Sequence, residues 1–158
     1  MFREMRRNKQ LLTQKETEEI LINGKTAILG LSGDEDYPYT VPVNYVYDNG
    51  KIYFHCAKEG HKIDAIKRNN RVSACVIDKD DVCPEKLTTL FKSVIAFGRA
   101  RILENEDEIY SSAERLALKY NSDKDFADKE IEKYFNVLCC VEIDIEHMTG
   151  KQCIELRQ

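Results

Sequence analysis

The sequence contains no tryptophan, only three prolines and seven glycines, and no long apolar run. A membrane-spanning helix needs about 20 consecutive apolar residues, so none is predicted. The opening MFREMRRNKQ continues into polar residues instead of an apolar secretory core, which makes the cytoplasm the expected location. Because Pro, Gly and Ser nowhere gather into a linker, we expect a single domain over residues 1–158.

The charge balance also excludes some functions. The chain has 158 residues, 42% of them hydrophobic and 33% charged, and its formal net charge is -4. The apolar share is enough to build a core at this length. A dedicated nucleic-acid binder would carry a clear excess of Lys and Arg, so a nucleic-acid partner is not expected.

The six cysteines form no CxxC pair, and the three histidines lack zinc-ligand spacing with them. We therefore expect no metal site. Without an export signal, reduced thiols are expected in place of disulfides. Cys139 and Cys140 are neighbours in a strand pattern, so their side chains should point to opposite faces.

Alternation of residue types gives the firmest structural prediction. Residues 39–47, YTVPVNYVY, alternate so that one face holds Tyr39, Val41, Val43, Tyr45 and Tyr47. Asn49 and Gly50 follow, and both tolerate the positive φ angles of a tight turn. Residues 51–57 then return as the second strand of a hairpin.

The other elements follow from caps and periodicity. Thr13 and Glu16 have capping-box spacing, and Gly24 is expected to end this first helix in a left-handed conformation. Further helices are predicted at residues 61–68, 105–120 and 122–135, and strands at 26–32, 71–78, 90–103 and 137–145. About six antiparallel strands with three to four peripheral helices indicate a mainly β protein, a small barrel.

The helix that starts at His61 is a candidate anion site. Free N–H groups and the positive dipole end at a helix start favour an anion. Lys62 in the first turn has the wrong charge for that dipole unless an anion, such as a phosphate, is bound. His61, and Lys67 or Arg68, could add donors. The alternative is a solvated helix start that happens to contain a lysine.

Three polar residues lie in otherwise apolar strands: Asn44, His55 and Ser93. They fit either rim or satisfied core positions, or an apolar slot for a planar cofactor. His55 titrates in a range useful for acid–base catalysis, although a lone strand histidine is commonly structural. A Cys–His nucleophile is not expected, because Cys56 and His55 are adjacent and face opposite ways.

Beyond these patterns, the run TVPVNYVYDNGKIYFHCAKEGHKIDAIKRNNRVSACVID at residues 40–78 resembles the FMN-binding split barrels related to pyridoxamine 5'-phosphate oxidase. The likeness is to the branch that contains Nim-type nitroimidazole resistance proteins. SVIAFGRARIL from Ser93 looks like the next long strand, and MTGKQ at residues 148–152 looks like the C-terminal signature. The resemblance covers roughly residues 5–152.

The resemblance implies a homodimer with FMN in the cleft between two barrels. By this resemblance, the strand along the isoalloxazine ring contains Pro42, Val43, Asn44 and Tyr45, and a second strand beside the flavin contains His55 and Cys56. The phosphate-binding pair is His61 and Lys62, and the polar residue at the ring edge is Ser93.

Departures from the family shape the expected activity. Pyridoxamine phosphate oxidases carry Ser-Arg-Lys where this chain has Gly60-His61-Lys62, and a substrate lysine where it has Tyr45. They also carry a tryptophan-bearing C-terminal motif that this chain lacks. These differences weigh against vitamin oxidation more than against flavin binding.

We therefore expect an FMN-dependent oxidoreductase that reduces a nitroaromatic or another small oxidised molecule. His55 is the candidate catalytic residue, and electrons would come from a nicotinamide cofactor or a partner reductase. The alternative functions are a non-catalytic flavin or haem binding or sensor protein, and a ligand-free interaction protein on the same barrel. Deazaflavin in place of FMN also remains open at this point.

Overall fold

The computed structural model describes residues 1–157, which form seven β-strands and four α-helices. The fold is mainly β, as predicted. The strands are β1 (Thr26–Ser32), β2 (Pro38–Asn44), β3 (Val46–Asp48), β4 (Lys51–Ala57), β5 (Arg71–Cys83), β6 (Thr88–Ile102) and β7 (Leu138–Gln152). The helices are α1 (Gln14–Asn23), α2 (His61–Arg68), α3 (Glu106–Tyr120) and α4 (Lys124–Tyr134).

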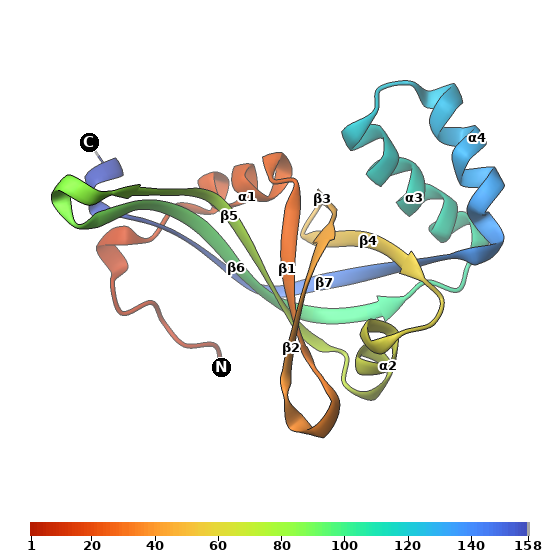
Figure 1. Cartoon of the computed structure of the whole chain (residues 1–158), viewed down its shortest axis with the longest axis horizontal. Helices are drawn as coiled ribbons and strands as arrows, with labels where there is room; N and C mark the ends of the chain where they lie inside the picture. Colours follow the sequence, from red (N-terminus) through yellow and green to blue (C-terminus); the bar gives the residue numbers. More distant parts are fainter. Residues whose placement is uncertain (158) are drawn as a thin grey trace.

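All strand pairs are antiparallel, and the strand order is β2-β1-β5-β6-β7-β4-β3. The two edge strands, β2 and β3, are consecutive in the chain and are separated only by Tyr45. The sheet therefore curls until its edges meet at one residue (Figure 1). This arrangement is the split barrel that the sequence predicted.

Tyr45 also accounts for the extra strand. Residues 39–47 were predicted as one strand, but the structure divides them into β2 and β3. The Tyr45 side chain is fully buried, and its hydroxyl donates to the Leu21 carbonyl at 2.7 Å. The predicted alternation survives the break, because the other residues of that face also pack against the core.

Two other predicted boundaries were wrong. The strands predicted at residues 71–78 and 90–103 extend toward each other and form one long hairpin, because β5 continues to Cys83 and β6 begins at Thr88. The last strand runs to Gln152 instead of Ile145, since Lys92–Gln152 pairing extends the ladder. Figure 1 shows these strands reaching far beyond the barrel, as an arm beside the C-terminus.

The helix caps follow the sequence, with one exception. Thr13 and Glu16 form the complete capping box of α1. Asn49 and Gly50 adopt φ angles of 47° and 80°, as the tight turn requires. Gly24, however, is extended, with φ -64° and ψ 142°. The lack of a side chain at Gly24 allows close packing instead, because a Cβ there would lie 2.6 Å from the Tyr45 hydroxyl.

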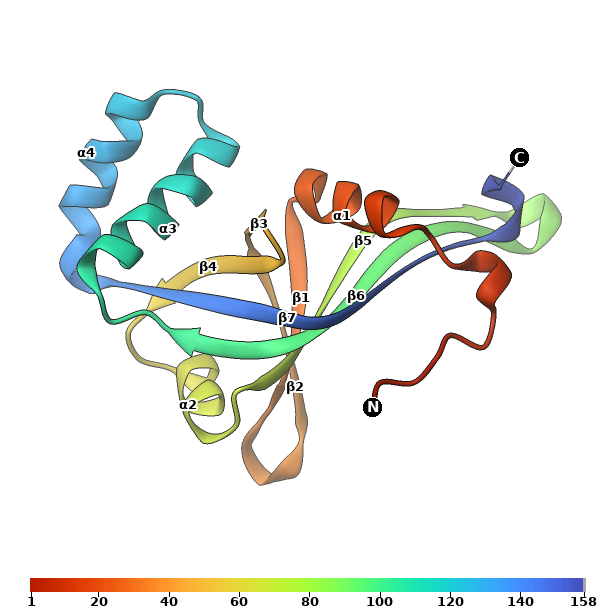
Figure 2. The same cartoon turned by 180° about the vertical axis from the view of Figure 1, so that it is seen from behind.

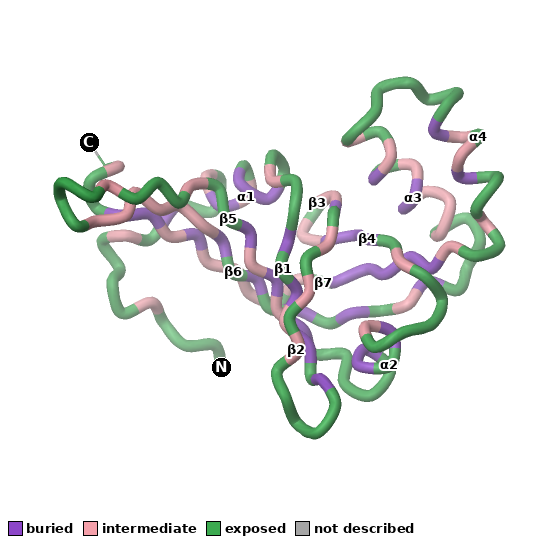
Figure 3. Tube along the Cα trace, in the orientation of Figure 1, coloured by how far each residue is buried: buried purple, intermediate pink, exposed green. Residues whose placement is uncertain are grey.

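The main core fills the barrel, and a smaller one lies under α3 and α4 (Figure 3). As predicted, Cys139 and Cys140 point to opposite faces of β7. Cys139 belongs to the barrel core and Cys140 to the smaller cluster. The α3–α4 hairpin stands at the end of the sheet opposite the hairpin arm, while α2 packs below it against the barrel (Figure 2). Within residues 1–157, no helix combines the length and apolarity that a membrane crossing requires.

Candidate functional site

The barrel is open beyond Tyr45, where the two edges of the sheet separate. β3 pairs with β4 only through Val46–Tyr53, Tyr47–Ile52 and Asp48–Lys51. In the described chain, the second half of β4 is therefore paired only on its β7 side, and β2 only on its β1 side. Two strand edges with free backbone groups thus face the same opening, and unpaired backbone groups need a partner.

This opening is part of a cleft of about 890 Å³. Its size lies within the range of about 300–1,000 Å³ typical of small-molecule sites. One wall consists of β2, the end of β4 and the start of α2, and the other consists of α3, α4 and the segment that follows them. The lining is mostly apolar with a few polar groups, which is the composition expected for a planar, partly polar ligand.

The cleft brings together six of the nine residues predicted for the cofactor site. They are Pro42, Val43, Asn44, His55, Cys56 and Lys62. They come from three separate elements, so the fold alone places them side by side. Asn44 is held in position by its side-chain amide, which donates to the Lys25 carbonyl at 3.1 Å.

Lys62 supplies the positive charge of the cleft. Its ammonium lies 6.0 Å from the centre of the Phe54 ring, and its charge adds to the effect of burial in lowering the pKa of His55. The start of α2 is also suited to an anion. Gly60 takes a φ of 127°, and among the described side chains none caps this helix start. The first N–H groups of α2 and Lys62 can therefore bind a phosphate together.

His55 and Cys56 are adjacent on β4, and burial shifts the pKa of each toward its neutral form. Burial by the cleft walls, together with the charge of Lys62, lowers the pKa of His55. Its imidazole is therefore neutral at pH 7 and can hydrogen-bond a ligand in that form. Burial, followed by the nearby Cys139 thiol, raises the pKa of Cys56 to about 11. Cys56 is consequently a neutral thiol at physiological pH.

Tyr45 and His61, both predicted for the site, do not line the cleft in this chain. Tyr45 points into the barrel core, as described above. The His61 ring stacks on Tyr39, with ring centres 4.0 Å apart, and its Nε2 lies 3.6 Å from an Asp34 carboxylate oxygen. The His61 side chain is thus engaged elsewhere, and this residue can offer an anion only its backbone N–H in the first turn of α2.

Ser93, the ninth predicted residue, lies on the outer face of the sheet. On β6 it is opposite Ile77 and Lys151, and it shares its face with Ile95. The same face is continuous with the cleft. One register row runs from Pro42 in the cleft across Ile28, Cys75 and Ile95 to Thr149.

The second wall of the cleft comes mostly from the helical segment at residues 106–135, whose role the sequence left open. It is formed by Ala113, Leu116, Ala117, Tyr120, Asn121, Phe126, Ala127, Glu130, Ile131, Tyr134, Val137 and Leu138. A signal was present, since α3 and α4 both combine small and large apolar residues on one face, and Phe126 and Tyr134 remain half exposed. Periodicity shows that such a face exists but not where it docks.

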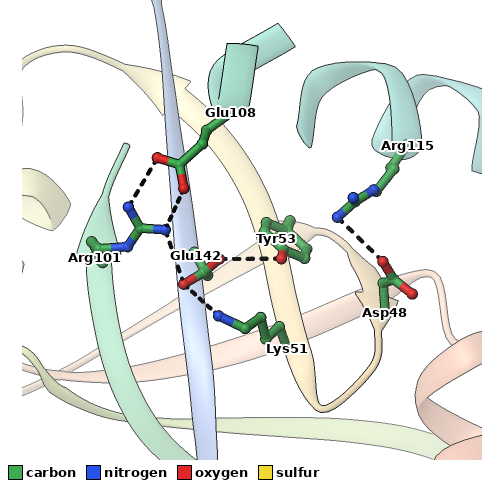
Figure 4. A network of polar contacts seen from close by, with 7 residues as sticks. All are labelled: Asp48, Lys51, Tyr53, Arg101, Glu108, Arg115 and Glu142. Atoms are coloured by element: carbon green, nitrogen blue, oxygen red, sulfur yellow. Dashed lines mark hydrogen bonds and ion pairs between the residues drawn. The ribbon is translucent and has the colours of Figure 1, made fainter. Parts of the chain in front are cut away.

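A paired polar network closes the other half of β4 (Figure 4). Glu142 of β7 is only 7% exposed and accepts hydrogen bonds from Lys51, Tyr53 and Arg101, at 2.9, 3.1 and 3.2 Å. Arg101 also makes a two-pronged pair with Glu108 of α3. The network fixes α3 to the barrel and thereby holds the second wall of the cleft.

A second hollow, of about 920 Å³, lies between α1, the Asn49–Gly50 turn and the end of β7. It is slightly larger than the first cleft, but none of the predicted site residues lines it. Nor do His, Cys, Asp and Glu side chains of residues 1–157 gather in a group of three that could hold a metal ion. The first cleft is therefore the better candidate site.

Solved structures with this fold include several of nearly the same extent. A candidate 5-nitroimidazole antibiotic resistance protein from Bacteroides thetaiotaomicron is 21% identical, with a TM-score of 0.74 over 89% of this chain and 85% of that chain. A conserved hypothetical protein from Mycobacterium tuberculosis is 18% identical, with a TM-score of 0.78 over 98% and 94%. An FAD and haem binding protein from Mycobacterium smegmatis is 15% identical, with a TM-score of 0.68 over 92% and 74%.

At these identities the structures establish the fold, and no curated protein matches the chain significantly in sequence. A family model does match, and it extends over residues 13–152. It includes every element from the start of α1 to the end of β7, and with them the cleft. The family that this model describes is pyridoxamine 5'-phosphate oxidase, and the chain belongs to that family.

Proposed function

We propose that this protein binds FMN in the cleft and acts as a flavin-dependent oxidoreductase on a small oxidised molecule such as a nitroaromatic. The observation that carries the proposal is the convergence of Pro42, Asn44, His55 and Lys62 at the open edges of the sheet. A flavin needs an apolar slot for its rings, hydrogen-bonding groups along its heteroatom edge and a cation for its phosphate. The cleft offers all three.

The phosphate end is the best defined part of the proposal. Lys62 and the uncapped start of α2 would hold the phosphate. Pro42 and Val43 would lie along the ring system, with Asn44 and the free backbone groups of the second half of β4 at its polar edge. FMN suits this cleft because its single phosphate matches a single cationic site.

A second copy of the chain would complete the site. The outer face next to Pro42 is apolar, and Ile77 and Ile95 are 51% and 44% exposed on it. A homodimer that buries this face would place Ser93 of one protomer toward the cleft of its partner. The position of Ser93 outside its own cleft is consistent with such a shared site.

In the proposed reaction the flavin, when bound, transfers the electrons, and the protein orients the substrate and excludes water. His55 is the candidate catalytic residue, because it is the histidine that lines the cleft. Its lowered pKa favours the neutral imidazole, which would donate a hydrogen bond to a substrate oxygen. Electrons would come from a nicotinamide cofactor or a partner reductase.

A non-catalytic flavin or haem binding protein is the second candidate. It is favoured by the neighbour from Mycobacterium smegmatis, whose name gives both FAD and haem as its ligands. His55 would be the haem ligand, since it is the cleft residue of the right chemistry. Loss of haem in His55→Ala would support this function.

The test is the visible spectrum of the purified protein and the mass of the chromophore it releases. Flavin bands and the mass of FMN are expected. His55→Ala should keep the flavin but lose most of its nitroreductase turnover, and full turnover would remove His55 from the mechanism. A colourless protein that takes up no added FMN would refute the proposal.

A further inference from the structure

Two cysteines occupy directly opposite positions on neighbouring strands at the edge of the cleft. Cys56 on β4 is the register partner of Cys139 on β7. Both side chains lie on the core side of the sheet, where Cys139 is buried and Cys56 packs against the same cluster. Burial raises the pKa of Cys56, and the neighbouring Cys139 thiol raises it further, as expected for thiols on the same face of paired strands.

The geometry of the strand pair suits a disulfide. Opposite residues of antiparallel strands have Cα atoms about 4.5 or 5.5 Å apart, depending on the type of pair. Disulfides join Cα atoms separated by about 4.4–6.8 Å, so either type of pair falls within the range. The bond could therefore close by side-chain rotation, without movement of the backbone.

This pair is distinctive among the cysteines. All six are free thiols in the described chain, and no other two of them are register partners there. Cys140 faces away, toward α3, and its Sγ contacts the Ile109 carbonyl oxygen at 3.7 Å. Cys75 lies on the outer face opposite Ile28 and Ile95. Cys56 also lines the cleft, so a small reagent can reach one sulfur of the pair.

We propose that Cys56 and Cys139 form a redox-active dithiol that a small organic disulfide, entering through the cleft, oxidises to a cross-strand disulfide. The proposal is independent of the flavin. Cys56 loses its proton to solvent and attacks one reagent sulfur, so the reagent S–S bond breaks and one thiol leaves. Cys139 then loses its proton and attacks the Cys56 sulfur, which releases the second thiol. The protein gives up two protons and two electrons, and the reagent is reduced to two thiols.

The cleft explains why the dithiol would remain reduced until such a reagent binds. Burial keeps Cys56 protonated at neutral pH, which slows the first attack. Once the mixed disulfide has formed, the second attack is intramolecular between directly opposite residues of paired strands and is fast. A mixed disulfide on Cys56 should therefore not accumulate.

The experiment treats the purified full chain with one equivalent of the aromatic disulfide dithiodipyridine. We expect twice that amount of thiopyridone to be released, and a protein mass lower by the two thiol hydrogens. Tryptic digestion should then give a linked pair of peptides, residues 52–58 and 134–151, with fragment ions that separate Cys139 from Cys140.

Two variants sharpen the result. Cys139→Ala should retain one reagent group on Cys56, because no second thiol can displace it. Cys75→Ser should behave as the unchanged chain, since Cys75 lies on the opposite face of the sheet. A lasting single adduct on Cys56 in the unchanged chain, or a linked peptide joined through Cys140, would overturn the proposal, and neither result depends on a variant that folds.

Discussion

The two halves of β4 lie under the same helical hairpin, but their polar side chains differ in whether they have protein partners. In the first half, Lys51 and Tyr53 are fixed by Glu142 in a network that also reaches α3. In the second half, His55 and Cys56 line a cleft together with Lys62. The first half holds the walls together, and the second half leaves its groups available to a ligand.

The difference shows how structural polar groups can be separated from binding groups. The charge of a buried carboxylate is compensated when three donors bind it. Removing that carboxylate leaves the donors without an acceptor and lowers the free energy of unfolding. The positive charge of a lysine and of an uncapped helix start beside a cleft is compensated only when an anion binds there. Mutations in the two halves should therefore affect different measurements.

The largest effect is expected for Glu142→Ala, which should lower the free energy of unfolding by about 3 kcal/mol. The buried Tyr53 hydroxyl loses its acceptor, and Lys51 and Arg101 lose a shared partner. Urea titration measures the change. Glu146→Ala is the matched control, because its exposed pair with Arg99 should contribute less than about 1 kcal/mol.

Glu142 should also make stability depend on acid. Burial alone would raise its pKa, but hydrogen bonds from Lys51 and Arg101 hold that pKa below the usual 4.5. Its contribution is therefore complete above pH 4.5 and is lost as the pH falls through the lowered value. Equal acid sensitivity in Glu142→Gln and the unchanged chain would contradict this assignment.

The next largest expected effect is the low reactivity of the Cys56 thiol. Because burial raises its pKa from 9.0 to about 11, its thiolate fraction at neutral pH should be about 100-fold below that of an exposed cysteine. Iodoacetamide labelling followed by mass spectrometry should show a rate that still rises between pH 9 and 11. The same cysteine in urea serves as the control, and a plateau near pH 9 in the folded chain would refute the prediction.

Lys62→Ala should weaken FMN binding by more than about tenfold, since hydrogen bonds to charged groups contribute about 1.5–3 kcal/mol. Flavin fluorescence titration measures the affinity. Lys67→Ala, at the other end of α2, removes the same charge from an exposed position and should leave the affinity nearly unchanged. Equal losses in both variants would assign the effect to net charge and not to a phosphate contact.

The smallest effect is expected for Asn105→Ala. Asn105 caps α3 by accepting a hydrogen bond from the Glu108 N–H at 3.1 Å, and loss of such a cap costs about 1 kcal/mol. Because α3 covers both halves of β4, thermal unfolding should shift while FMN affinity changes little. A large loss of affinity would mean that the two halves are more tightly coupled than the structure indicates.

Much of this molecule could be predicted because the information is local. The Thr13–Glu16 cap, the Asn49–Gly50 turn and the alternation of residues 39–47 each depend on neighbours in the chain. The family resemblance added which strands face the site. It also named six residues that the fold then brought to one cleft.

The rest depended on contacts between distant segments. At the break, the Tyr45 hydroxyl donates to the distant Leu21 carbonyl, and Gly24 leaves room for that same hydroxyl. Likewise, the role of α3 and α4 as a cleft wall depends on Glu142 and Arg101, which lie on other strands. No periodicity in a single segment carries such information.

The closure of the barrel at Tyr45 has a consequence for how the sequence can change. β2 and β3 belong to one uninterrupted stretch, so the register of both sheet edges is counted from a single residue. One residue inserted between Tyr39 and Tyr47 would turn every side chain on one side of it to the other face. Substitutions in this stretch can be tolerated one at a time, but its length cannot change, whereas the hairpin tip at residues 84–87 is free to lengthen.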